Sequence, residues 1–198
     1  MRKLILAGVV AMTLGAASAH ADPILVNGDF GTNDFTGWAS SGATGVADSA
    51  FYVAVAGSTG DTGTGSFASF GGGNSGPTGV LSQSIGTVSG QTYNLSFSYG
   101  AAGPNAAVQT ILVTAGDLSR TVTSAASTNN LTTALVDYTF SFTAAGSSTI
   151  ITFADTSAVT FSVDALLDNV GIPEPASMLV LGAGLIALAG ARRHGGGR

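Results

Sequence analysis

Alternation of apolar and polar side chains is the pattern that most limits the folds open to this chain. Two segments, 91–99 and 136–142, carry an aromatic or apolar residue at every second position, with polar residues between. A period of two predicts half-buried strands whose strong β formers face a core. The core-side residues are Tyr93, Leu95, Phe97 and Tyr99 in the first segment and Tyr138, Phe140 and Phe142 in the second.

Residues 22–171 show no sustained period of 3.6, which is the sign of an amphipathic helix. Turn-rich segments separate further, weaker strand patterns. About nine strands without helices between them predict an all-β fold, an antiparallel β-sandwich. The weaker patterns lie at 51–56, 66–70, 80–85, 108–114, 118–123, 149–153 and 161–170.

Charge is distributed unevenly along the chain. Residues 22–171 contain ten aspartates and a single cation, Arg120, which gives a formal charge of −9. A surface this acidic repels nucleic acid and anionic lipid headgroups, so we expect no nucleic-acid partner. The chain has no cysteine, which excludes disulfides and thiolate-bound zinc.

Composition also excludes several kinds of catalysis. Residues 22–171 contain no His, Cys, Lys or Glu. A Ser-His-Asp triad, a cysteine nucleophile, a Schiff-base lysine and a histidine-bound metal are therefore excluded. Paired aspartates can hydrolyse a glycoside, but no recognisable pair is present. We expect no enzyme, with an Asp-dependent glycosidase as a distant alternative. The aspartates considered are Asp48, Asp61, Asp117, Asp137, Asp155, Asp164 and Asp168.

The N-terminus predicts a secretory signal peptide over residues 1–21. Arg2 and Lys3 precede an apolar stretch over 4–14, and Ala19-His20-Ala21 supplies the small-x-small cleavage pattern. We expect export by the Sec machinery and cleavage by signal peptidase after Ala21, with a competing pattern that ends at Ala19. An uncleaved anchor is the weaker alternative because the apolar stretch is short.

A second signal occupies the other end of the chain. Pro173-Glu174-Pro175 is followed by an uncharged apolar run over 178–191 and then by Arg192 and Arg193. A full membrane span takes about 20 apolar residues, so this run predicts a short transmembrane helix. The two arginines favour a cytoplasmic location for its far end.

These three elements together resemble the PEP-CTERM sorting signal of Gram-negative bacteria. The resemblance covers residues 172–198, and Ile172 stands where that family most often has Val. It implies a transient stay in the inner membrane and recognition by exosortase at Pro173-Glu174-Pro175. Sorting to the cell surface or the extracellular matrix would follow. An ordinary short tail anchor is the alternative.

Other segments resemble galactose-binding-like jelly rolls, as found in many carbohydrate-binding modules. They are Leu25-Val-Asn-Gly-Asp-Phe30 with Phe35-Thr-Gly-Trp38, the stretch 81–97, and Phe161-Ser-Val-Asp-Ala-Leu-Leu-Asp-Asn-Val170. The resemblance implies one jelly-roll domain over 22–171. In that family the opening segment and an acid of the closing strand share a structural calcium.

Carried over, the calcium candidates are Asn27, Asp29 and Asp168, and calcium is the one cofactor that the resemblance suggests. Gly31 stands where the family's Glu would be. Calcium takes six to eight oxygen ligands, which aspartate-rich loops can supply. The alternative is that Asn27-Gly28-Asp29 is simply a turn.

Glycan contact needs an aromatic face with hydrogen-bonding neighbours. Tyr52 and Phe70 lie beside Gly-rich segments and are candidates for such contact, whereas Trp38 is expected in the core. Arg120 is a candidate contact for an acidic exopolysaccharide, with a salt bridge to Asp117 as the alternative. The sequence thus predicts an exported structural or adhesive protein associated with exopolysaccharide or biofilm. A stand-alone carbohydrate-binding module is the alternative.

Overall fold

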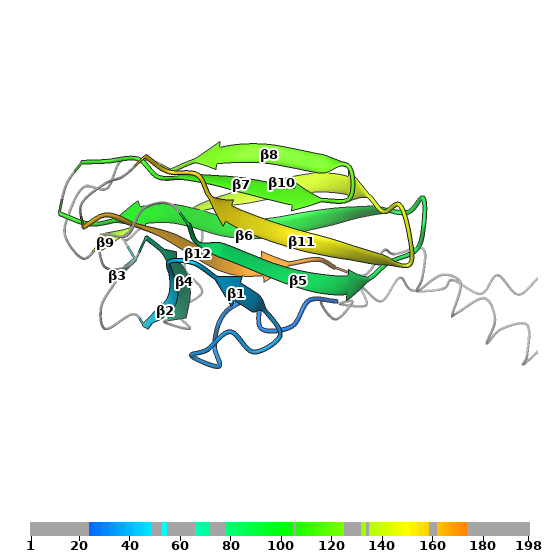
Figure 1. Cartoon of the computed structure of the whole chain (residues 1–198), viewed down its shortest axis with the longest axis horizontal. Helices are drawn as coiled ribbons and strands as arrows, with labels where there is room; N and C mark the ends of the chain where they lie inside the picture. Colours follow the sequence, from blue (N-terminus) through cyan, green and yellow to red (C-terminus); the bar gives the residue numbers. More distant parts are fainter. Residues whose placement is uncertain are drawn as a thin grey trace, which may run out of the picture.

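Two five-stranded antiparallel sheets lie face to face in this computed structural model (Figure 1). The structure describes residues 24–48, 53–54, 66–71, 78–104, 106–124, 132–133, 135–158 and 162–173. All regular elements within these ranges are strands. The predicted all-β antiparallel sandwich is therefore confirmed.

The first sheet has the order β1-β5-β11-β7-β8, and the second has the order β10-β6-β12-β4-β2. The strands of the first sheet are β1 (Ala39–Ser41), β5 (Val80–Gly86), β7 (Thr110–Ala115), β8 (Leu118–Thr123) and β11 (Ser148–Asp155). Those of the second are β2 (Thr44–Asp48), β4 (Ser66–Phe70), β6 (Thr92–Ala102), β10 (Val136–Thr143) and β12 (Asp164–Gly171). A short parallel pair joins β3 (Val53–Ala54) to β9 (Thr132–Thr133).

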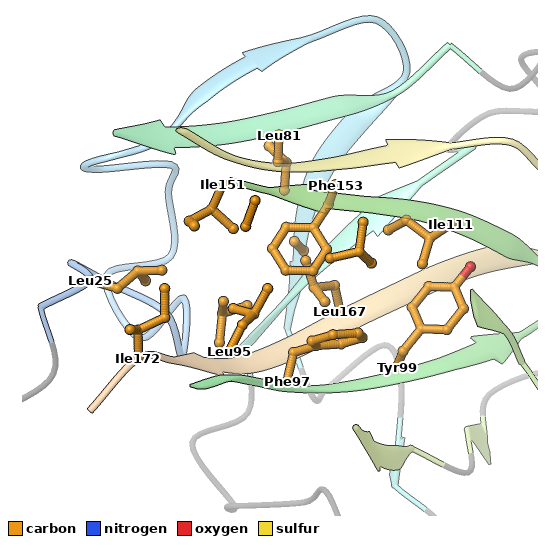
Figure 2. Packing of buried hydrophobic residues seen from close by; sticks show 14 of the residues in the cluster. Leu25, Leu81, Leu95, Phe97, Tyr99, Ile111, Ile151, Phe153, Leu167 and Ile172 are labelled. Carbon is orange, nitrogen blue, oxygen red and sulfur yellow. The ribbon is translucent and has the colours of Figure 1, made fainter. Parts of the chain in front are cut away.

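The predicted alternation places one main core between the sheets. Leu95 and Phe97 of β6 face Ile151 and Phe153 of β11 across the interior (Figure 2). Phe97 and Phe153 meet edge to face with ring centroids 5.2 Å apart, an arrangement that aromatic pairs prefer. Because strand residues alternate between faces, the polar residues of β6 point to the opposite, outer side of the second sheet.

That outer side carries a second, smaller apolar cluster. It consists of Phe67, Ala102, Leu135 and Leu166, with Ala47 packed against it. Leu166 belongs to this cluster while its neighbours Ala165 and Leu167 belong to the main core, so β12 separates the two. The apolar cluster covers one part of the outer face and leaves a polar part beside it.

Trp38 lies in the main core with 7% of its surface exposed, as predicted. Its ring packs against Phe30 and Phe153, at centroid separations of 5.8 and 6.2 Å. Its indole N–H donates to the carbonyl of Asn27 at 3.0 Å. The buried ring is therefore satisfied and ties the opening loop to the sandwich.

Both ends of the described chain lie at the same end of the sandwich (Figure 1). The amide of Ile24 donates to the carbonyl of Ile172 at 3.2 Å. Ile172 is fully buried in the main core, and Pro173 directly after it is exposed. The fold therefore extends to the residue that precedes Pro173-Glu174-Pro175.

The predicted signal peptide and C-terminal helix lie outside the described residues. Within the described ranges, no helix has the length and hydropathy that a membrane span requires.

Candidate functional site

A hollow of about 360 Å³ opens on the polar part of the outer face of the second sheet. Strands β6, β10 and β12 supply its walls. Its lining consists of Ser96, Phe97, Ser98, Asp137, Tyr138, Thr139 and Asn169. Five of these seven residues carry polar groups that can donate or accept hydrogen bonds at the outer face. We refer to this feature as the hollow.

A row of three residues crosses the floor of the hollow from strand to strand. Ser98 of β6 lies opposite Asp137 of β10 on one side and opposite Asp168 of β12 on the other. The Ser98 hydroxyl donates to Asp137 Oδ1 at 2.7 Å. Asp137 is exposed, whereas Asp168 has 1% of its surface exposed. The carboxylate that reaches a ligand from this row is thus that of Asp137.

An irregularity in β12 brings Asn169 into the same site. The register of β12 against β6 shifts between Asp168 and Gly171, and Asn169 has a φ of 53°. A bulge inserts a residue and redirects a side chain, and Asn tolerates this left-handed conformation better than most residues. Asn169 Nδ2 consequently reaches Ser98 Oγ at 3.2 Å.

The result is a directed chain of hydrogen bonds from Asn169 through Ser98 to Asp137. Each donor group is held by its acceptor, so the side chains are oriented before a ligand arrives. Asp137 Oδ2 accepts no hydrogen bond from the residues that the structure describes. The hydroxyl of Thr139, on β10, lies on the same face, opposite Ser96. Such a surface suits a ligand with many hydroxyl groups.

The predicted calcium residues lie close in the fold but are otherwise engaged. Val170 N donates to Gly28 O at 2.8 Å, so the opening loop does reach the closing strand. The Asn27 amide, however, donates to the carbonyls of Asp34 and Thr36, at 3.0 and 3.2 Å, and its Oδ1 accepts from Thr32 N.

Asp29 is exposed and accepts the amide of Gly31 at 3.2 Å. In the described ranges, no group of three or more His, Cys, Asp or Glu side chains is placed to hold a metal ion. Asn27 and Asp29 thus bond to the loop's own backbone, and Asp168 accepts the amide of Asn169 at 2.7 Å. No step below depends on calcium.

The predicted glycan contacts fall in three different places. Phe70 has no exposed surface and packs in the main core, which corrects the expectation that it contacts a glycan. Tyr52 lies outside the described residues. Arg120 is exposed on β8, in the other sheet. No ion pair joins it to Asp117, whose carboxylate instead accepts the amide of Thr143 at 2.6 Å.

Of the predicted processing residues, only Pro173 is described. Those outside the described ranges are Ala19, Ala21, Glu174, Pro175, Arg192 and Arg193.

Residues 22–158 match the family of carbohydrate binding domains, which is more than half of the chain. The chain belongs to this family. Residues 171–193 match the PEP-CTERM protein-sorting motif. Both predicted resemblances are therefore confirmed, and the carbohydrate-binding domain carries a motif for export and surface sorting in bacteria through exosortase. Neither match is to a catalytic family.

Solved structures of similar shape include carbohydrate-binding modules and an adhesin domain, and also an exo-β-1,3-galactanase and the enzymatically active domain of a bacteriophage tailspike protein. TmCBM61, in complex with β-1,4-galactotriose, has a TM-score of 0.49 and 16% identity, covering 76% of this chain and 97% of its own. The K1 cleaved adhesin domain of Lys-gingipain from Porphyromonas gingivalis W83 has a TM-score of 0.48 and 16% identity, covering 70% and 91%. CBM35 from Paenibacillus barcinonensis has a TM-score of 0.45 and 14% identity, covering 71% and 95%. No curated protein sequence matches this carbohydrate-binding protein.

Sequence reasoning did not identify the hollow, although Asp137 was among the aspartates considered for catalysis. The polar faces of 91–99 and 136–142 were visible as alternation, and they supply Ser96, Ser98, Asp137 and Thr139. Their pairing was not visible, because nothing local specifies which strands become neighbours. Asn169 reaches the site through a bulge that has no alternation signal.

Proposed function

We propose that the mature protein is displayed on the bacterial surface or in its matrix, where the hollow binds exopolysaccharide. The observation that carries this proposal is a preorganised set of hydrogen-bonding side chains on a domain of a carbohydrate-binding family. Sugar hydroxyls both donate and accept, so they match the mixed groups of Ser96, Thr139 and Asn169. Ser98, with 1% of its surface exposed, orients Asp137 and Asn169 from beneath.

Binding of this kind works through polar contacts and without an aromatic platform. The large apolar side chains exposed in the described part of the chain are all aliphatic: Val26, Val88, Val108, Val136 and Ile150. Each single contact is therefore weak. Many copies on one surface would hold a long polymer through several sites at once, because effective concentration multiplies weak affinities. This suits a structural or adhesive role in a biofilm.

The proposed route begins with Sec export and removal of residues 1–21 by signal peptidase. The apolar run over 178–191 then holds the chain in the inner membrane of a Gram-negative cell. Exosortase acts at Pro173-Glu174-Pro175, and the domain over 22–171 reaches the surface. The burial of Ile172, directly before the exposed Pro173, supports a route in which the folded domain ends where the motif begins.

The route is tested by the intact mass of the protein recovered from the host's surface and from its culture medium. The expected species begins at Asp22 and ends near residues 173–175. Recovery of a species that still carries 178–198 in the inner membrane contradicts the sorting route and favours a tail anchor.

Glycan binding is tested by retention of the purified protein on polysaccharide isolated from the same host. Retention should survive high salt and be competed by free sugar. Ser98→Ala removes the buried hydroxyl that holds Asp137 and Asn169 in place. It should weaken binding about tenfold, because the ligand must then order these two side chains itself. Ser84→Ala, on the outer face of the opposite sheet, is the matched control.

If Ser98→Ala and Ser84→Ala bind the polysaccharide equally well, the hollow is not the binding site. No retention of the unaltered protein, with an intact fold by circular dichroism, favours a structural matrix role without a defined ligand.

A further inference from the structure

The charge of the hollow points to a more specific ligand class than exopolysaccharide in general. Asp137 is the only residue of its lining with a formal charge, and no Lys, Arg or His lines it. Asp168 adds a second carboxylate beneath the floor, on the far side of Ser98. With ten aspartates and one cation over 22–171, the rest of the domain reinforces a negative potential at the site.

This potential acts against acidic sugars. A uronate or a sulfated sugar in the hollow would place an anion next to Asp137 with no cation from the lining to compensate it. Like charges close together cost free energy, most of all where water is partly excluded. The electrostatics thus disfavour acidic polymers in the hollow, and Arg120, their expected contact, lies on the other sheet.

A sugar with a free amine fits the same group well. Its ammonium offers three N–H donors, as the lysine ammonium does, and forms a charge-assisted hydrogen bond with a carboxylate. Ser98 already holds Asp137 through Oδ1 at 2.7 Å, which leaves Oδ2 for the ligand. The hydroxyls next to the amine would then meet Thr139 and Asn169.

We propose that the hollow selects glycans that contain unacetylated hexosamine, with the ammonium on Asp137. This inference rests on the proposed glycan binding at the hollow and narrows it to one charge class. N-acetylation removes both the charge and two of the three donors, so the acetylated sugar should bind more weakly. A neutral hexose keeps only the hydroxyl contacts.

The test compares trisaccharides of glucosamine, N-acetylglucosamine, glucose and glucuronic acid, each titrated calorimetrically into the purified protein at pH 6. Glucosamine should bind about threefold to tenfold tighter than the two neutral trisaccharides, the range expected of a partly exposed ion pair. Glucuronate should bind weakest. The preference should fade towards pH 9, since an amine beside electron-withdrawing groups titrates at about pH 8.

Attraction of a cationic ligand to an acidic protein must be separated from binding in the hollow. Asp137→Asn removes the charge at the site, whereas Asp117→Asn makes the same change in net charge at the β7–β8 turn. The inference requires that only Asp137→Asn abolishes the preference for the amine. Equal losses in both variants overturn it in favour of general surface charge.

The outcomes also distinguish this inference from the function on which it rests. If neutral trisaccharides bind as tightly as glucosamine and Ser98→Ala weakens them, glycan binding stands and the amine preference is refuted. If no trisaccharide binds, the inference and the proposed binding at the hollow fail together.

Discussion

Gly28 and Val170 meet backbone to backbone where the opening loop crosses the closing strand. The amide of Val170 donates to the carbonyl of Gly28 at 2.8 Å, and a Cβ built on Gly28 would lie 1.8 Å from the carbonyl oxygen of Val170. No real side chain tolerates that distance. Glycine is therefore required here for close approach, and the contact locks the first described residues to the last strand.

Gly28→Ala should destabilise the domain by about 3 kcal/mol, because the loop must move away from β12 and lose the hydrogen bond. Urea unfolding followed by tryptophan fluorescence measures this directly, since Trp38 donates to Asn27 next to the altered position. Gly86→Ala is the control: a Cβ there meets nothing within 4 Å. Similar urea midpoints for the two variants would show that the loop moves away from β12 without loss of stability.

Replacement by Phe should have opposite effects on the stability of the domain at Tyr99 and at Tyr93. Both belong to β6 and are buried in the main core. The Tyr99 hydroxyl has no hydrogen-bond partner among the described residues, whereas Tyr93 Oη accepts the amide of Val88 at 2.8 Å. Tyr99→Phe should stabilise the domain by about 1 kcal/mol, and Tyr93→Phe should destabilise it by about 1 kcal/mol. If both substitutions destabilise the domain, the Tyr99 hydroxyl has a hydrogen-bond partner in solution.

Alkaline pH gives Tyr99 a second test. Burial, and then the charge of Asp155, raise the pKa of Tyr99 well above its ordinary value of 10.0. The unfolded chain loses this proton more easily than the folded chain, so the stability that the neutral phenol provides is complete below pH 10 and decreases above it. Thermal unfolding from pH 8 to 11 should show this loss in the unaltered protein. Tyr99→Phe should reduce the slope, and an unchanged slope counts against the shift.

The side-chain amide of Gln83 makes the two backbone hydrogen bonds to the opening segment that a neighbouring strand would otherwise make. Its side chain is 6% exposed; Oε1 accepts the amide of Val26 at 2.7 Å and Nε2 donates to the carbonyl of Val26 at 2.9 Å. Gln83→Ala leaves both backbone groups without a partner and should cost about 2 kcal/mol in chemical unfolding. Ser84→Ala, exposed on the same strand, should change stability by less than about 0.5 kcal/mol. Equal effects would mean that water replaces the Gln83 amide.

Asp34 predicts a loss of stability in acid. Hydrogen bonds from Thr32 and Thr36 lower the pKa of Asp34 from its ordinary value of 3.8. A lowered pKa means that the ionised form stabilises the fold above pH 3.8, and that this contribution disappears as pH falls through the lowered value. The melting temperatures of the unaltered protein and of Asp34→Asn should differ at pH 7 and converge near pH 2. A constant difference would indicate a steric effect.

The long strands were predictable because each has a buried face and a solvent face. The alternation in 91–99 and 136–142 corresponds to β6 and β10, and the main core contains the residues expected there. The short strands β1 and β2 gave no such signal. All three residues of β1 are exposed, so tertiary pairing with β5 and not a local pattern makes it a strand.

Phe70 shows why the site was harder to predict than the fold. Its position beside a Gly-rich segment suggested exposure, yet β4 is an interior strand of the second sheet, and Phe70 faces the core. Burial depends on strand order, which pairs residues far apart in sequence. Ser98 lies 39 residues from Asp137 and 71 from Asn169. No local rule joins three such residues into one site.

The bulge in β12 also determines how the protein would bear mechanical load. Asn169, on the wall of the hollow, and Pro173, where the described chain ends, lie four residues apart on one continuous stretch. A pull between a bound polymer and an attachment beyond Pro173 would run along that stretch. The parts that resist it are the pairing of Gly171 with Ser96 and the buried side chain of Ile172.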